Sequence, residues 1–121
     1  MKVKQRDPVA AAAVASHDPG IDLDKPIFTL SVASEILEVH PRTLMMYEHL
    51  SMISPKRTVT NRRRYSRRDV MKLQAIQSLT REHHVNLAGV RYILVLLKRL
   101  HNAGVEPPAD LKNLDVSQLD V

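Results

Sequence analysis

The stretch SPKRTVTNRRRYS, residues 54–66, decides the fold of this chain. Ser54-Pro55 ends the helix expected before it, because proline cannot continue a helix and pushes the preceding residue towards extended backbone. Two short runs, 56–58 and 62–65, then flank the turn residues 59–61. This arrangement predicts a small hairpin rich in basic residues.

Positive charge is concentrated around this hairpin. Residues 56–68 hold seven Lys and Arg and no acid. Residues 31–100 hold 13 Lys and Arg against 5 Asp and Glu, a net charge of +8, whereas the whole chain has 18 against 13, a net charge of +5. A block of one sign inside a globular stretch indicates a polyanionic partner, the alternative being a solvated patch without one.

The hairpin can present its arginines on both faces. Because side chains alternate along a strand, Arg62 and Arg64 are expected on one face and Arg63 on the other. We expect two of the three to touch a nucleic-acid backbone and one to be structural.

Two short helices precede the hairpin and form a helix-turn-helix pattern. Ser31 is the expected N-cap of the first helix, which runs to about Leu37, and Pro41 is suited to the first position of a second helix that ends near Leu50. The apolar residues of the first helix are Val32, Ile36 and Leu37, and in the second helix Leu44, Tyr47 and Leu50 can face inward. The outer face of the second helix is expected to carry Arg42, Met45, Met46 and His49.

Two longer helices follow the hairpin. Ser66 caps a third helix that reaches about Glu82, with Asp69 near its positive end. The apolar stripe expected on it is Val70, Leu73, Ile76 and Leu79. A fourth helix starts at Asn86 and carries two apolar stripes, so it needs two surfaces to cover it, one in its own domain and one in a second copy of the chain. These stripes are Val90, Leu94, Leu97 and Ile93, Leu96, Leu100.

Length and composition restrict the function. A chain of 121 residues allows one domain with tails, and without cysteine there is no disulfide framework or thiolate metal site. Aromatic residues make up only 3%, which argues against a single-strand stacking platform. The adjacent pair His83-His84 lacks the spacing of a zinc site, so no metal or other cofactor is expected. No catalytic constellation is present, and an enzyme is not expected.

The predicted organisation has three parts: a disordered arm over 1–26, a DNA-binding domain with its dimerisation helix over 27–101, and an acidic tail over 102–121. Apolar residues of the tail, from Leu111 to Leu119, suggest a short turn that depends on a partner. A basic start and Ala13-Val14-Ala15 invite an export signal, but Asp7-Pro8 interrupts it, so we predict a cytoplasmic, nucleoid-associated protein. The longest bulky apolar run has six residues, too few to cross a membrane.

The order of these elements resembles the MerR family of bacterial transcription regulators. The strings that carry the resemblance are Val32-Ala33, His40-Pro41-Arg42-Thr43-Leu44, Tyr47-Glu48, Ser54-Pro55-Lys56-Arg57-Thr58, Asn61-Arg62-Arg63-Arg64-Tyr65-Ser66 and Asp69. The run Asn86-Leu87-Ala88-Gly89-Val90 resembles the heat-shock repressor branch in particular. The resemblance covers about residues 27–100.

The resemblance implies a mainly α fold: a winged helix-turn-helix of MerR type with a small β-hairpin wing and a short C-terminal dimerisation helix. It implies a homodimer that binds double-stranded DNA at inverted repeats and represses chaperone genes, with a DnaK-type chaperone as a possible co-repressor. The candidate DNA-binding residues are Arg42, Thr43, Met46, Tyr47, Lys56, Arg57, Arg62, Arg63, Arg64 and Tyr65. The candidate dimer residues are Val90, Ile93, Leu94, Leu97 and Leu100.

Alternatives stay open at this point. Arg42 reads a base or phosphate, or is merely solvated, and Tyr47 donates to a phosphate or packs in the core. Met45 stands where the family commonly has Arg, and Ser51 where it commonly has Gly, so a different helix end or a conformational cost is expected at Ser51. Gly104 and two prolines shorten the last helix, which predicts a small dimer contact. The competing functions are a chaperone-binding adaptor and an excisionase-like architectural DNA-binding protein.

Overall fold

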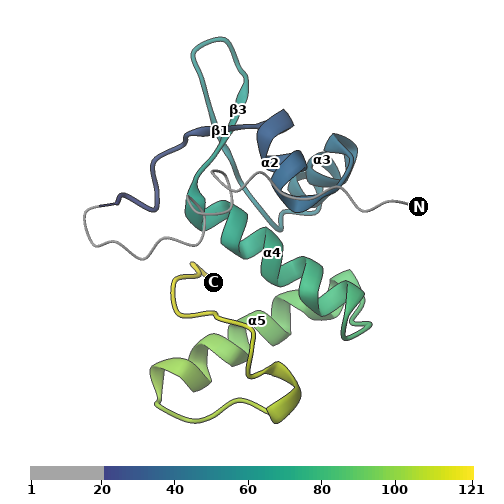
Figure 1. Ribbon diagram of the computed structural model, residues 1–121, viewed down its shortest axis with the longest axis vertical. Helices are drawn as coiled ribbons and strands as arrows, with labels where there is room; N and C mark the ends of the chain where they lie inside the picture. The colour runs from purple at the N-terminus through teal and green to yellow at the C-terminus, as the bar shows by residue number, and fades with distance from the viewer. Residues whose placement is uncertain (1–20) are drawn as a thin grey trace. The chain divides into compact units, whose positions relative to one another are not determined.

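The computed structural model describes residues 21–121 (Figure 1). Most of the arm predicted over 1–26, together with the export signal weighed there, lies outside the described residues. The chain forms two compact units, the first ending at Val70 and the second comprising Met71–Val121.

The first unit contains the helix-turn-helix, formed by α2 (Leu30–Leu37) and α3 (Pro41–His49). Helix α3 begins at Pro41 as predicted, and the His40 imidazole caps it by accepting from the Arg42 amide at 3.1 Å. The cap predicted for α2 was wrong by two residues. Thr29 occupies that place, with its hydroxyl accepting from the Val32 amide at 3.1 Å, because strand pairing already holds Thr29 extended.

The end of α3 keeps a left-handed turn even though glycine is absent. Ser51 has a φ of 60°. Its amide donates to the Glu48 carbonyl, and the Met52 amide donates to the Tyr47 carbonyl, each at 2.9 Å. These two bonds form a Schellman motif, in which a non-glycine residue carries a steric cost. Of the two outcomes expected for Ser51, the structure therefore has the conformational cost.

A three-stranded antiparallel sheet accompanies the helices. Its strands are β1 (Phe28–Thr29), β2 (Lys56–Arg57) and β3 (Arg63–Tyr65), in the order β1-β3-β2. Strands β2 and β3 form the predicted hairpin, which projects from the rest of its unit in Figure 1. The third strand, β1, was not predicted, and its two residues are too few to give a periodic signal.

The core of the first unit lies between this sheet and the two helices. Its buried apolar residues are Phe28, Ala33, Ile36, Leu37, Leu44, Tyr47, Met52, Ile53, Tyr65 and Val70. One predicted inward position was wrong, because Leu50 is 43% exposed; on α2 the apolar Val32 is 39% exposed. Ala33 is buried beside Val32 in the sequence, and the turn at Ser51 brings Met52 and Ile53 into the core instead of Leu50.

The longer helices match the sequence closely. Helix α4 (Arg67–Arg81) starts in a capping box, in which the Ser66 hydroxyl accepts from the Asp69 amide and the Asp69 carboxylate accepts from the Ser66 amide. Its predicted stripe from Val70 to Leu79 is fully buried. Helix α5 (Leu87–Asn102) is capped by Asn86, whose side-chain oxygen accepts from the Gly89 amide at 2.8 Å.

The segment after α5 folds back within the second unit. It contains the short 3-10 helix η1 (Ala109–Leu111), and then Val116 and Leu119 become buried. The Lys98 ammonium donates to the backbone carbonyls of Val116, at 3.3 Å, and Ser117, at 2.7 Å. Val116 and Leu119 are therefore covered by other residues of the second unit. Within the described part of the chain, no helix is long and apolar enough to span a membrane.

Candidate nucleic-acid interface

The outer face of α3 is open to solvent. Arg42 and His49 are exposed, Met45 is 41% exposed and Met46 is 43% exposed, as predicted for this face. Arg42 lies in the first turn, where side chains of a groove-reading helix reach base edges. Met45 adds a flexible apolar surface at the place where a cation was expected from the resemblance.

Two tyrosines of the candidate set are buried. Tyr47 is 7% exposed and Tyr65 is 0% exposed, so both belong to the core of the first unit. Burial raises the pKa of Tyr65 to about 12, and the nearby charge of Glu48 adds to this shift. The Tyr65 hydroxyl has no hydrogen-bond partner among the described residues. Both side chains are therefore largely inaccessible to DNA.

The wing carries two facing pairs of cations. In the register of the hairpin, Lys56 lies opposite Arg64 and Arg57 lies opposite Arg63. Like charges directly opposite each other destabilise a sheet. Consecutive residues point to opposite faces, so the two pairs lie on opposite faces of the hairpin.

One carboxylate of α3 neutralises the second pair. Arg57 Nη2 donates to Glu48 Oε2 at 2.7 Å, and Arg63 Nε donates to Glu48 Oε1 at 2.5 Å. Partial burial opposes ionisation of Glu48, but the hydrogen bonds and charges of Arg63 and Arg57 outweigh it and lower the pKa of this carboxyl. Glu48 follows Tyr47 directly in the sequence, and its role was not predicted. The signal that could have indicated a role for Glu48 is its position as the last acidic residue before the basic residues 56–68.

The first pair has no such partner. Neither Lys56 nor Arg64 forms an ion pair within residues 21–121, and the Arg64 guanidinium donates to the neighbouring Arg63 carbonyl, at 3.0 Å. The charge of Lys56 does reach Asp24 and helps to lower its pKa, after the larger effect of the Arg68 hydrogen bond. Asp24, however, pairs with Arg68 at 2.8 Å.

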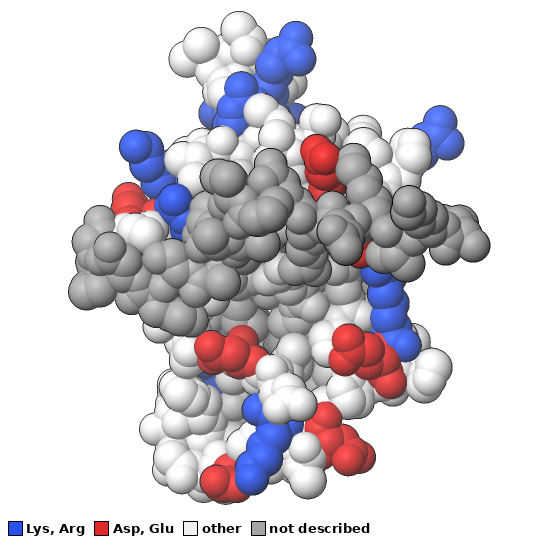
Figure 2. All heavy atoms as spheres, viewed as in Figure 1, with Lys and Arg blue, Asp and Glu red and all other residues white. Residues whose placement is uncertain are grey.

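A hollow lies where the wing meets the starts of the two helices. Its volume is about 490 Å³, and its lining is Thr29, Leu30, Ser31, Pro41 and the run Asn61–Arg64. The lining thus combines Arg62 and Arg64, and the Arg63 that Glu48 neutralises, with the N-terminal ends of α2 and α3, and helix N-termini favour anions. Blue spheres gather over the hairpin at the top of Figure 2.

Helix α5 separates its two apolar stripes as the sequence suggested. Val90, Leu94 and Leu97 are buried inside the second unit, so these candidate dimer residues instead form its core. On the other stripe Leu96 is 59% exposed, and the neighbouring Tyr92 is 71% exposed. Ile93 and Leu100 are partly exposed beside them.

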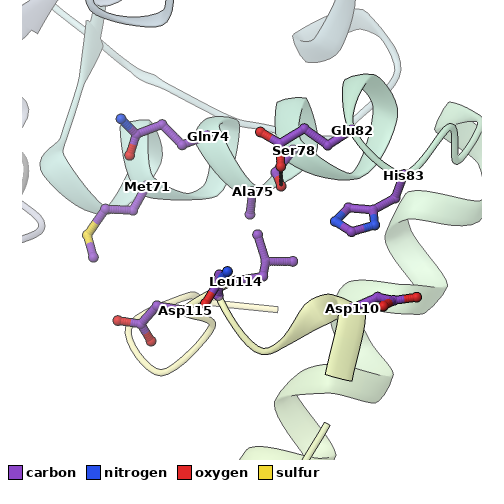
Figure 3. A pocket seen from close by; sticks show the side chains of 10 residues that line it. Met71, Gln74, Ala75, Ser78, Glu82, His83, Asp110, Leu114 and Asp115 are labelled. Atoms are coloured by element: carbon purple, nitrogen blue, oxygen red, sulfur yellow. Dashed lines mark hydrogen bonds between the residues drawn. The ribbon is translucent and has the colours of Figure 1, made fainter. Parts of the chain in front are cut away.

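The second unit also has a polar hollow of about 520 Å³ between α4 and the C-terminal segment (Figure 3). Glu82, His83, Asp110 and Asp115 line it, yet residues 21–121 contain no cluster of His, Asp and Glu able to hold a metal ion. This lining contains no Lys or Arg and shares no residue with the basic surface of the first unit.

Residues 28–106 match the family described as MerR HTH family regulatory protein. The chain belongs to this family. It is therefore a DNA-binding transcription regulator and not an enzyme. The fold is the expected one, mainly helical with a small antiparallel sheet of three strands.

Two relatives give the comparison more detail. The chain is 41% identical over 73 residues to a protein named heat shock protein HspR from Streptomyces coelicolor, a match that covers 60% of this chain and 48% of the relative. It is 30% identical over 94 residues to the HTH-type transcriptional regulator GlnR of Bacillus anthracis, covering 78% of this chain and 71% of the relative. The chain thus spans about half the length of HspR.

Proposed function

We infer that this regulator is a homodimeric repressor that binds inverted-repeat operators of stress and chaperone genes. The observation that supports DNA contact at this surface is the facing pair Lys56 and Arg64, two cations opposite each other in the wing that form no ion pair within residues 21–121. A phosphate between them would relieve their repulsion. The likeness to HspR supports the heat-shock assignment.

The proposed contacts follow from exposure and charge. Arg42 and Met46 on α3 face the groove, with Thr43 at its edge, and the wing neutralises phosphates of the adjoining backbone. The wing residues proposed for this role are Lys56, Arg62 and Arg64.

The exposed stripe of α5 supports the dimer. Leu96 and Tyr92 offer apolar surface that a twofold-related copy would cover, while Ile93 and Leu100 flank them. Twofold symmetry of the protein is mirrored in an inverted repeat whose half-sites lie about one helical turn of DNA apart, or a multiple of it. Operator binding would place the protein at the nucleoid in the cytoplasm.

The salt dependence of operator binding tests this function. Three wing cations per protomer give about six neutralised phosphates per dimer, so the logarithm of the binding constant should fall with the logarithm of salt with a slope of about −5. A fluorescence-anisotropy titration of an inverted-repeat duplex, with a scrambled duplex as control, measures this slope. A flat salt response, or equal affinity for both duplexes, would rule the proposal out.

A DnaK-type chaperone is proposed as co-repressor, in keeping with the heat-shock branch. If so, adding the chaperone should tighten operator binding in the same titration. Capture of the chaperone with no binding of duplex DNA would instead favour the adaptor function. Strong bending of DNA carrying several adjacent sites would favour the architectural one.

A further inference from the structure

We propose that Glu48 divides the cations of the wing into two groups, making Arg57 and Arg63 positioning residues that hold the wing against α3 and leaving Lys56, Arg62 and Arg64 to meet phosphate. The proposal rests on DNA binding by the surface described above and assigns roles within it. It removes Arg57 and Arg63 from the candidate DNA contacts.

The geometry of the carboxylate supports the first group. Each Glu48 oxygen accepts from a different guanidinium, at 2.7 Å from Arg57 and 2.5 Å from Arg63. These two arginines lie opposite each other on β2 and β3, so a single side chain of α3 is bonded to both strands at one rung. The Glu48 and Arg63 side chains are only 23% and 22% exposed, which protects the cluster from solvent screening.

The two ion pairs of Glu48 with Arg57 and Arg63, called the clamp from here on, also affect the opposite face of the wing. Because alternate side chains of a strand point to opposite sides, fixing Arg57 and Arg63 against α3 also fixes the direction of Lys56 and Arg64. A wing held in one orientation loses less conformational entropy when it binds the duplex. It also contacts the DNA backbone at one fixed position relative to α3. Glu48 thus acts on specificity through the wing, without touching DNA.

Adjacent residues of β2 provide a matched test of this division. Lys56 and Arg57 are both exposed, and each carries one positive charge. Lys56→Gln should make the salt slope of operator binding shallower by about two per dimer, since one phosphate contact is lost in each protomer. Arg57→Gln should leave the slope nearly unchanged, because this guanidinium is already paired with Glu48. Equal changes in the slope for the two variants would overturn the proposal.

Removing the clamp itself should have the opposite effect. In Glu48→Gln both guanidiniums lose their carboxylate and become available to phosphate, so the slope should steepen by up to about four per dimer. Affinity for the scrambled duplex should rise, and the ratio of operator to scrambled affinity should fall. Adding Arg57→Gln to this variant should remove about half of the increase in the salt slope.

A control variant separates the clamp from overall charge. Glu38 is exposed and forms no ion pair within residues 21–121, so Glu38→Gln adds the same positive charge without freeing an arginine. The same rise in slope for Glu38→Gln and Glu48→Gln would show that Glu48 acts only through net charge, which would overturn the proposal. If Glu48→Gln does not fold, the Lys56 and Arg57 pair decides alone.

Failure of the proposed function has a different signature. If the wild-type protein shows no salt-dependent binding of duplex DNA, both the proposed DNA-binding surface and the proposed division of its cations are ruled out. If the wild-type protein has a slope near −5, but Arg57→Gln reduces the slope as much as Lys56→Gln does, only the division of the cations is ruled out.

Discussion

Truncation of Leu96 to alanine should weaken the proposed dimer strongly. Fully burying a leucine side chain contributes about 1.5–3 kcal/mol, and Leu96 is 59% exposed in one protomer, so covering the rest contributes about 1–2 kcal/mol. A twofold interface buries this side chain twice, and alanine retains only a small part of the surface. We therefore expect a loss of about 2–3 kcal/mol, which is about a 30- to 150-fold rise in the dimer Kd.

Sedimentation equilibrium over a range of protein concentrations measures this change directly. Leu50→Ala is the matched control, because Leu50 is also a partly exposed leucine, at 43%, but lies at the end of α3 in the first unit. Its dimer Kd should stay at the wild-type value. An unchanged Kd for Leu96→Ala, or equal effects of the two substitutions, would refute the assignment of this stripe to the interface.

Three further predictions concern the stability of the fold. Ser51→Gly should stabilise the protein by about 1 kcal/mol and raise its Tm by several degrees, since a φ of 60° costs serine about 1–2 kcal/mol and glycine gives part of this back in chain entropy. Ser66→Ala should lose about 1 kcal/mol in a urea titration, whereas Ser31→Ala should lose far less, because the first hydroxyl caps a helix and the second does not. Glu48→Gln should lower the free energy of unfolding by about 1 kcal/mol at pH 7. This difference in the free energy of unfolding should shrink as the pH falls below 4.5. A carboxyl with a lowered folded-state pKa stabilises the protein above its unfolded-state pKa and loses that contribution when it is protonated. A difference that does not depend on pH would contradict the ion-pair cluster.

The sequence predicts the helices well where local chemistry and period agree. The cap at Ser66, the stripe from Val70 to Leu79 and the start at Pro41 depend on residues only three or four positions apart, and all three are confirmed. The short elements are predicted less well from the sequence. Strand β1 has two residues and exists through its pairing with β3, more than 30 positions away, so the pairing that holds Thr29 as a cap has no local signal.

The candidate site shows the same division. Exposure of Arg42, Met45 and Met46 follows from helical spacing, and the structure has them on the surface. Burial of Tyr65 depends on its position opposite Phe28 in the sheet, which the sequence of the hairpin alone does not contain. The tyrosine closest to the basic run is thus a core residue whose hydroxyl has no partner among the described residues.

The number of cations available to DNA depends on where the carboxylates lie, and the salt slope measures that number. Counted from the sequence, seven cations between residues 56 and 68 would neutralise about fourteen phosphates in a dimer and give a slope of about −13. In the structure Glu48 is paired with two of them and Asp24 with a third, and a fourth, Arg67, lies on α4 outside the wing. The wing thus retains three cations that form no ion pair among the described residues. The slope then expected is about −5, a difference far larger than the error of a titration. One series of salt concentrations on the wild-type protein therefore distinguishes a wing that binds DNA with all its charge from one in which part of that charge is committed to holding the wing in place.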